Sequence, residues 1–93
     1  MDAPSPGSPR RPRALRRSSA VLFGAELRTR RTAKGVSQAA LAGASGLSTD
    51  AISKLERGLR QPALETMLRL GAELGVPAAE MVAVVEKAWE REP

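Results

Sequence analysis

A glycine between two short apolar segments, Gly46, constrains the fold of this chain most. The surrounding residues 37–58 read SQAALAGASGLSTDAISKLERG. Large apolar residues stand on both sides of the glycine: Leu41, Leu47, Ile52 and Leu55. Glycine tolerates the positive φ of a tight turn, and a side chain as small as that of Ala42 lets two backbones approach closely. The stretch therefore predicts two short helices that cross steeply, with the large residues filling the angle between them.

Further segments with apolar residues at helical spacing lie on both sides of this pair. Serine is a favoured N-cap, proline is tolerated in the first turn of a helix, and glycine often follows the last turn. These signals predict five helices, over about 20–33, 38–45, 49–57, 62–74 and 77–90. The expected buried face of the fourth helix comprises Leu64, Met67, Leu68, Gly71 and Leu74. Only 2% of the residues are aromatic, so an aliphatic core and an all-α fold class are expected.

The chain contains no cysteine, no histidine and no tyrosine. It therefore lacks thiolate metal ligands and the usual general base, and it shows no paired carboxylates or glycine-rich phosphate loop. We expect no enzymatic activity, no metal site and no cofactor. The longest apolar run, MVAVV, is five residues long and too short to span a bilayer. No signal-peptide pattern is present, and the expected location is the cytoplasm, without a membrane partner.

The first 19 residues differ in composition from the rest of the chain. They contain four prolines and five arginines but only one acidic residue, Asp2. Prolines at this density prevent a continuous helix, and little apolar surface is available for burial. We predict a disordered basic arm over 1–19 and one globular domain over 20–91. The arm arginines are Arg10, Arg11, Arg13, Arg16 and Arg17. They would attract a polyanionic partner, although a tail that only aids solubility has the same composition.

The stretch 37–58 resembles the helix-turn-helix of the Cro/CI-type (XRE) DNA-binding family. Upstream, LRTRRTAKGVSQ resembles the first helix of that family, and downstream, ERGLRQPALETMLRLGAELGV resembles its fourth helix. The similarity extends from about Leu22 to Met81. The chain departs from the family pattern at three positions: Arg30, Ala40 and Ser45. The resemblance implies a compact five-helix, lambda-repressor-like domain that binds double-stranded DNA and regulates transcription.

In this family the third helix lies in the major groove, with its N-terminal residues at base edges. Ile52 and Leu55 must point to the core, so helical spacing directs a polar set outward: Thr49, Asp50, Ser53 and Lys54. The resemblance matches three of them to base-reading positions, with Ser53 beside them. Lys54 can donate to guanine and Asp50 can accept from cytosine N4. The alternatives are an interaction of Asp50 with the helix dipole and an ordinary solvated face for the others.

The residues expected to contact DNA phosphates are Ser37, Gln38, Arg57 and Arg60, of which the resemblance implies the contact of Gln38, with Ser37 assisting. The first two open the second helix, where the serine can also act as an N-cap alone. The two arginines follow the third helix and can reach the DNA backbone or remain solvated. The resemblance further implies a salt bridge between Arg31 and Glu56 that orients the third helix.

A single recognition helix covers only a few base pairs, and dimers of such proteins read two half-sites about 34 Å apart. The fifth helix carries an apolar stripe: Met81, Val82, Val85, Ala88 and Trp89. This stripe can pack on a second copy, close the core of one copy, or do both. The arginine-rich arm can follow a DNA groove or contact phosphates without sequence preference.

The sequence thus predicts a dimeric, sequence-specific DNA-binding regulator or repressor of transcription. The alternative is an antitoxin or another protein-interaction module, which would bind a toxin, a polymerase or another protein through the fifth helix or the arm. The polar outward surface of the third helix argues against that helix as the main protein interface.

Overall fold

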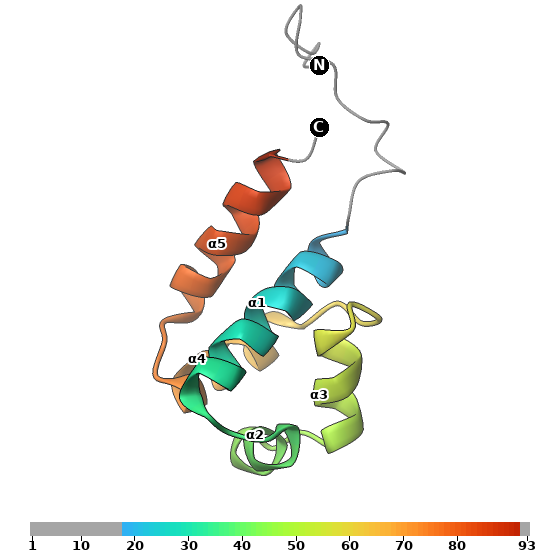
Figure 1. The fold of residues 1–93 in the computed structure, drawn as a ribbon, viewed down its shortest axis with the longest axis vertical. Coiled ribbons are helices and arrows are strands. Elements are labelled where there is room, and N and C mark those ends of the chain that lie inside the picture. The colour runs from blue at the N-terminus through green and yellow to red at the C-terminus, as the bar shows by residue number, and fades with distance from the viewer. Residues whose placement is uncertain (1–17, 92–93) are drawn as a thin grey trace, which may run out of the picture.

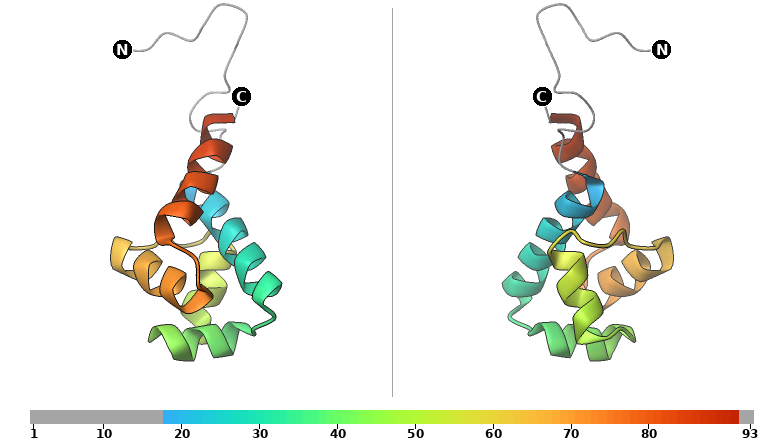
Figure 2. Two further views of the ribbon diagram at one scale, coloured as in Figure 1. Left: turned by 90° about the vertical axis from the view of Figure 1, so that its left-hand side faces the viewer. Right: turned by 90° about the vertical axis from the view of Figure 1, so that its right-hand side faces the viewer.

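A computed structural model describes residues 18–91, and within them the chain forms five helices and no strands (Figure 1). The helices are α1 Ser19–Lys34, α2 Gln38–Ser45, α3 Thr49–Glu56, α4 Leu64–Leu74 and α5 Ala78–Arg91. The expected all-α fold class is confirmed. α1 lies in the centre and packs against α3 on one side and α5 on the other, while α2 contacts both α3 and α4 (Figures 1 and 2).

The first helix begins earlier than the sequence predicts. The N–H of Val21 donates to Ser18 Oγ over 3.2 Å, so Ser18 is the N-cap and Ser19 is the first helical residue. Both serines fall within the predicted arm, yet serine is among the best N-cap residues. The arm boundary at residue 19 is therefore wrong by two residues. The five arm arginines lie outside the described residues.

The turn between α2 and α3 follows the capping pattern read from the sequence. Ser37 Oγ accepts from the N–H of Ala40, and Ser48 Oγ accepts from the N–H of Ala51, each over 3.0 Å. Gly46 has a φ of 74°, in the left-handed region that favours glycine. Ser45 is buried, and its hydroxyl donates to the carbonyl oxygen of Leu41 over 2.6 Å. A polar residue is tolerated at this point because the backbone of its own helix satisfies it.

The fourth helix begins at Leu64, two residues later than expected. Ala63 is extended at the N-cap position, and its side chain makes no capping hydrogen bond. Pro62 lies in the loop instead, where it lines an apolar hollow together with Phe23 and Met67. The ring of Pro62 thus takes part in packing rather than in the first turn of α4.

The core is aliphatic, apart from one phenylalanine: Phe23, Leu27, Leu41, Ala42, Ile52, Leu55, Leu70, Leu74 and Met81. The expected buried face of α4 is wrong at two positions, because Leu64 is 66% exposed and Leu68 is 55% exposed. The apolar arc of this helix is wider than the surface that α2 and α5 cover. Leu70, which the sequence pattern had not assigned to that face, is fully buried.

Arg30 links the first and fifth helices. Its guanidinium lies 2.7 Å from Glu26 on the same helix and 3.4 Å from Glu80 on α5. Arg30, which departs from the family pattern, therefore has its charge paired.

None of the helices within residues 18–91 has the length and apolar character needed to cross a membrane.

Candidate nucleic-acid interface

The third helix divides cleanly into a buried and a polar face. Ala51, Ile52 and Leu55 are buried against the rest of the domain. Three of the four expected base-reading residues are exposed, namely Thr49, Asp50 and Lys54, and Ser53 is half-buried. The right-hand view of Figure 2 looks onto α3, which lies at the surface along its whole length. The helix therefore presents donors and acceptors to solvent along its first two turns.

Two of these exposed residues are paired with each other. Lys54 Nζ lies 3.0 Å from a carboxylate oxygen of Asp50, one helical turn away. The hydrogen bond from Lys54 and its charge lower the pKa of Asp50, and the charges of Arg57 and Arg60 contribute to the lowering. The neighbouring positive charges therefore favour the ionised form of Asp50.

A cationic edge continues from the end of α3. Arg57 is the C-cap residue, and its Nε donates to the carbonyl oxygen of Ser53 over 3.3 Å. Arg60 lies in the following loop, and both arginines are exposed. Their placement next to the polar face of α3 gives this surface more positive than negative charge, as a nucleic-acid interface requires.

The orientation of α3 depends on a buried ion pair. Arg31 of α1 donates to Glu56 of α3 through Nε over 2.6 Å and through a terminal nitrogen over 3.1 Å. The same guanidinium donates to the carbonyl oxygen of Val36 over 2.8 Å. The Glu56 side chain is only 3% exposed. Bidentate pairs of this kind fix geometry as well as charge, so α3 is held at a defined angle to α1.

Gln38 joins this pair, which the sequence had not indicated. Its side-chain nitrogen donates to Glu56 over 2.9 Å, so one carboxylate connects α1, α2 and α3. Burial alone would raise the pKa of Glu56, but the hydrogen bonds from Arg31 and Gln38 outweigh it and lower that pKa. The family resemblance implies only a phosphate contact for Gln38, and nothing in the spacing reveals a partner 18 residues away.

The expected phosphate contacts at the start of α2 stay a prediction. Gln38 retains a second amide hydrogen that can reach a phosphate, since only one is directed at Glu56. Ser37 uses its oxygen as the cap acceptor, which leaves the hydroxyl hydrogen for donation. The helix N-terminus adds its own backbone N–H groups.

Close backbone contact also positions α3, at a glycine for which the sequence predicts no role. A Cβ on Gly24 of α1 would lie 2.3 Å from the carbonyl oxygen of Leu55 and 2.8 Å from that of Glu56. Gly58, which ends α3 with a φ of 72°, lies against Val21 in the same way. The signal for Gly24 was a lone glycine inside a helical pattern, which often marks close packing.

The expected dimer stripe of α5 is divided by the fold. Met81 is buried in the core, so its assignment to an interface is wrong. Val85 packs against that core and Ala88 is half-buried, whereas Val82 and Trp89 are exposed. The stripe therefore faces the core at Met81, and only its flank with Val82 and Trp89 remains accessible.

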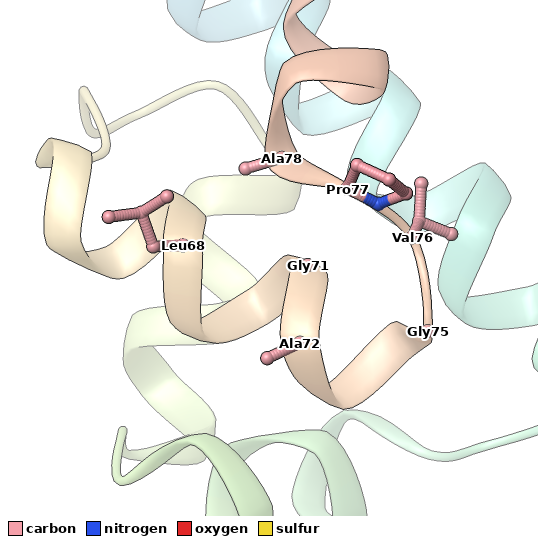
Figure 3. A pocket seen from close by; sticks show the side chains of 7 residues that line it. All are labelled: Leu68, Gly71, Ala72, Gly75, Val76, Pro77 and Ala78. Carbon is pink, nitrogen blue, oxygen red and sulfur yellow. The ribbon is translucent and has the colours of Figure 1, made fainter.

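A surface hollow between α4 and the start of α5 differs from the α3 surface, because its lining carries no charge (Figure 3). It is shallow and open to solvent, with a volume of about 440 Å³, and it is lined by Leu68, Gly71, Ala72, Gly75, Val76, Pro77 and Ala78. These residues offer aliphatic side chains and backbone, and no ionisable group. Within residues 18–91 no cluster of three or more potential metal-ligating side chains occurs.

Comparison with known proteins places this geometry in context. A family model described as "Helix-turn-helix domain" matches residues 22–84. A curated protein of Sinorhizobium fredii, an uncharacterized HTH-type transcriptional regulator named y4dJ, is 38% identical over 61 residues, which cover 66% of this chain and 79% of y4dJ.

Solved structures are similar as well. The clp gene regulator ClgR from Corynebacterium glutamicum superposes with a TM-score of 0.76 at 30% identity, over 83% of this chain and 99% of ClgR. The P22 c2 repressor, solved in complex with synthetic operator 9T, gives a TM-score of 0.60 at 34% identity, over 63% of this chain and 89% of the repressor.

Proposed function

The chain belongs to the helix-turn-helix domain family of transcription regulators, which are not enzymes, and we propose that it binds a specific operator through α3 in the major groove. The observation that carries this proposal is the exposed polar face of α3. Thr49, Asp50 and Lys54 stand on it, and the buried contact between Arg31 and Glu56 holds the helix in place behind them.

The division of roles follows from the chemistry of these side chains. Thr49 and Lys54 present groups that can donate to base edges, with Ser53 beside them, and Asp50 presents an acceptor. Arg57, Arg60 and the start of α2 supply phosphate contacts, which give affinity but carry no sequence information. The arginines of residues 1–17 add further salt-sensitive affinity for DNA. The proposed location of the protein is the cytoplasm.

The protein binds as a homodimer through α5. Val82 and Trp89 are partly exposed on one flank of this helix, and aromatic side chains are enriched at protein–protein interfaces. α5 lies across α1 from α3, so a dimer through α5 leaves both recognition helices free (Figure 1). A two-fold axis through α5 predicts an operator with two-fold symmetry.

Selection from a random duplex library with the full chain tests the proposal. We expect an enriched, two-fold-symmetric sequence that Thr49→Ala and Lys54→Ala bind at least tenfold more weakly. Lys87→Ala is the matched control, because Lys87 is an exposed lysine of α5. Absence of any enriched sequence, or an equal loss for the Lys87 variant, overturns the assignment of α3 as the reading helix.

A further inference from the structure

The third helix contains two carboxylates with opposite surroundings. Glu56 faces inward and is held by Arg31 and Gln38. Asp50 faces outward with its side chain 69% exposed, at 3.0 Å from the ammonium of Lys54. It is the acidic side chain of α3 that stands on the face proposed to meet DNA.

Cations surround this carboxylate along the same face of the helix. Lys54 is four residues away and Arg57 is seven residues away, so both follow Asp50 at successive turns. Arg60 adds its charge from the loop beyond, and the pKa of Asp50 is lowered by all three. Asp50 therefore offsets part of the positive charge that would otherwise face the phosphates.

A carboxylate on a DNA-binding surface opposes binding to most sequences. It repels phosphates, and it holds Lys54 in a contact that must be broken or shared on binding. Base edges in the major groove mostly present acceptors to it, except for the amino groups of cytosine and adenine. The N4 amino group of cytosine is the donor that carboxylates read, and it can replace the ammonium as the partner of Asp50.

Resting on the proposed function, we infer that Asp50 is a specificity-determining residue that weakens binding to non-cognate DNA and is compensated where a base-edge donor, above all the N4 amino group of cytosine, meets it. Lys54 is then released to donate to an adjacent guanine. Asp50 raises the ratio of specific to non-specific affinity by lowering the affinity for non-cognate DNA. A role of Asp50 at the helix dipole alone would change stability and leave this ratio unaltered.

The first arm of the test uses a duplex of random sequence, the full chain, Asp50→Ala and a control. Glu80→Ala is the matched control, because it removes one exposed carboxylate that also pairs with a cation, but on α5. We expect the Asp50 variant to bind the random duplex several-fold more tightly than wild type at 50 mM salt. The Glu80 variant should bind as wild type does.

The salt dependence of the same titrations identifies the cause. Releasing Lys54 to one phosphate makes the slope of log K against log [salt] steeper by about 0.9 for each protomer bound. The advantage of the Asp50 variant should therefore shrink by about three- to fourfold per protomer between 50 and 200 mM salt. Equal affinity of the Asp50 variant and wild type for the random duplex overturns the inference.

The second arm uses the enriched duplex and versions in which each C·G pair is replaced by T·A. At one pair in each half-site, wild type should lose roughly tenfold or more while Asp50→Ala loses at most a few-fold. If both proteins lose equally at every C·G pair, this inference fails while the proposed function stands. If no sequence is enriched at all, the proposed function fails and this inference with it.

Discussion

Gly24 on α1 faces the carbonyl oxygen of Leu55 on α3, at a distance that leaves no room for a side chain. A Cβ at this position would lie 2.3 Å from that oxygen. The obstacle is backbone at the end of α3, which is also held by the pair of Arg31 and Glu56. A methyl group at Gly24 must therefore push α1 and α3 apart, and it would do so beside the recognition helix.

Gly24→Ala should destabilise the domain by roughly 1–3 kcal/mol, as overpacking does, in spite of the better helix propensity of alanine. Gly43→Ala is the control, because nothing lies within 4 Å of a Cβ built there. In the control, only the gain in propensity acts, and it should stabilise by about 0.5–1 kcal/mol. Urea unfolding midpoints measure the stability change of each variant. A midpoint of Gly24→Ala equal to that of wild type would show that α1 and α3 have room for a methyl group at this position.

The sequence predicted the elements of this fold better than the contacts between them. Caps and turns at Ser37, Gly46 and Ser48 are local signals, since each depends on a few neighbouring residues. The partner of Gln38 and the exposure of Leu64 and Leu68 depend on which helices lie nearby. Hydrophobic spacing defines an apolar arc on a helix, but the packing of other elements decides how much of it is covered.

The same limit applies to the candidate interface. Helical spacing was enough to direct Thr49, Asp50 and Lys54 outward, because Ile52 and Leu55 fix the inward side of α3. It was not enough to separate Met81 from Val82, since the stripe of α5 serves both the core and the surface. The spacing of four residues between Asp50 and Lys54 is compatible with an ion pair, but only the structure shows that the pair forms.

Removing the charge of Glu56 should be costly. Glu56→Gln leaves the guanidinium of Arg31, whose side chain is only 12% exposed, without its counter-charge. Loss of one partner of a buried pair costs about 3–5 kcal/mol. Glu65→Gln is the control, because Glu65 pairs with Arg69 on the exposed surface of α4, and it should cost less than about 0.5 kcal/mol. Chemical denaturation compares the two, and similar losses would show that the Glu56 contact is not a structural pair.

The depressed pKa of Glu56 predicts how stability depends on pH. In the unfolded chain this carboxyl takes up protons below about pH 4.3, whereas in the folded protein it does so only at lower pH. Its contribution to stability is therefore full above that value and is lost as the pH falls through the folded-state pKa. Unfolding free energies measured from pH 7 to pH 3 should fall less steeply for Glu56→Gln than for wild type. Identical profiles would mean that the paired carboxylate is not the group whose protonation destabilises the fold.

The two flanks of α5 allow a test of the proposed dimer with the same substitution on each. Val82 and Val84 are both 41% exposed, but they point in nearly opposite directions around the helix, and only Val82 shares a flank with Trp89. Val82→Ser and Trp89→Ala should shift sedimentation equilibrium towards monomer and weaken binding to a two-half-site operator, while Val84→Ser should do neither. Met81→Ala, by contrast, should cost about 2–5 kcal/mol of unfolding free energy, because it empties part of the core. Equal effects of the two serine variants on self-association would exclude this flank as the interface, since the substitutions match in chemistry and in exposure.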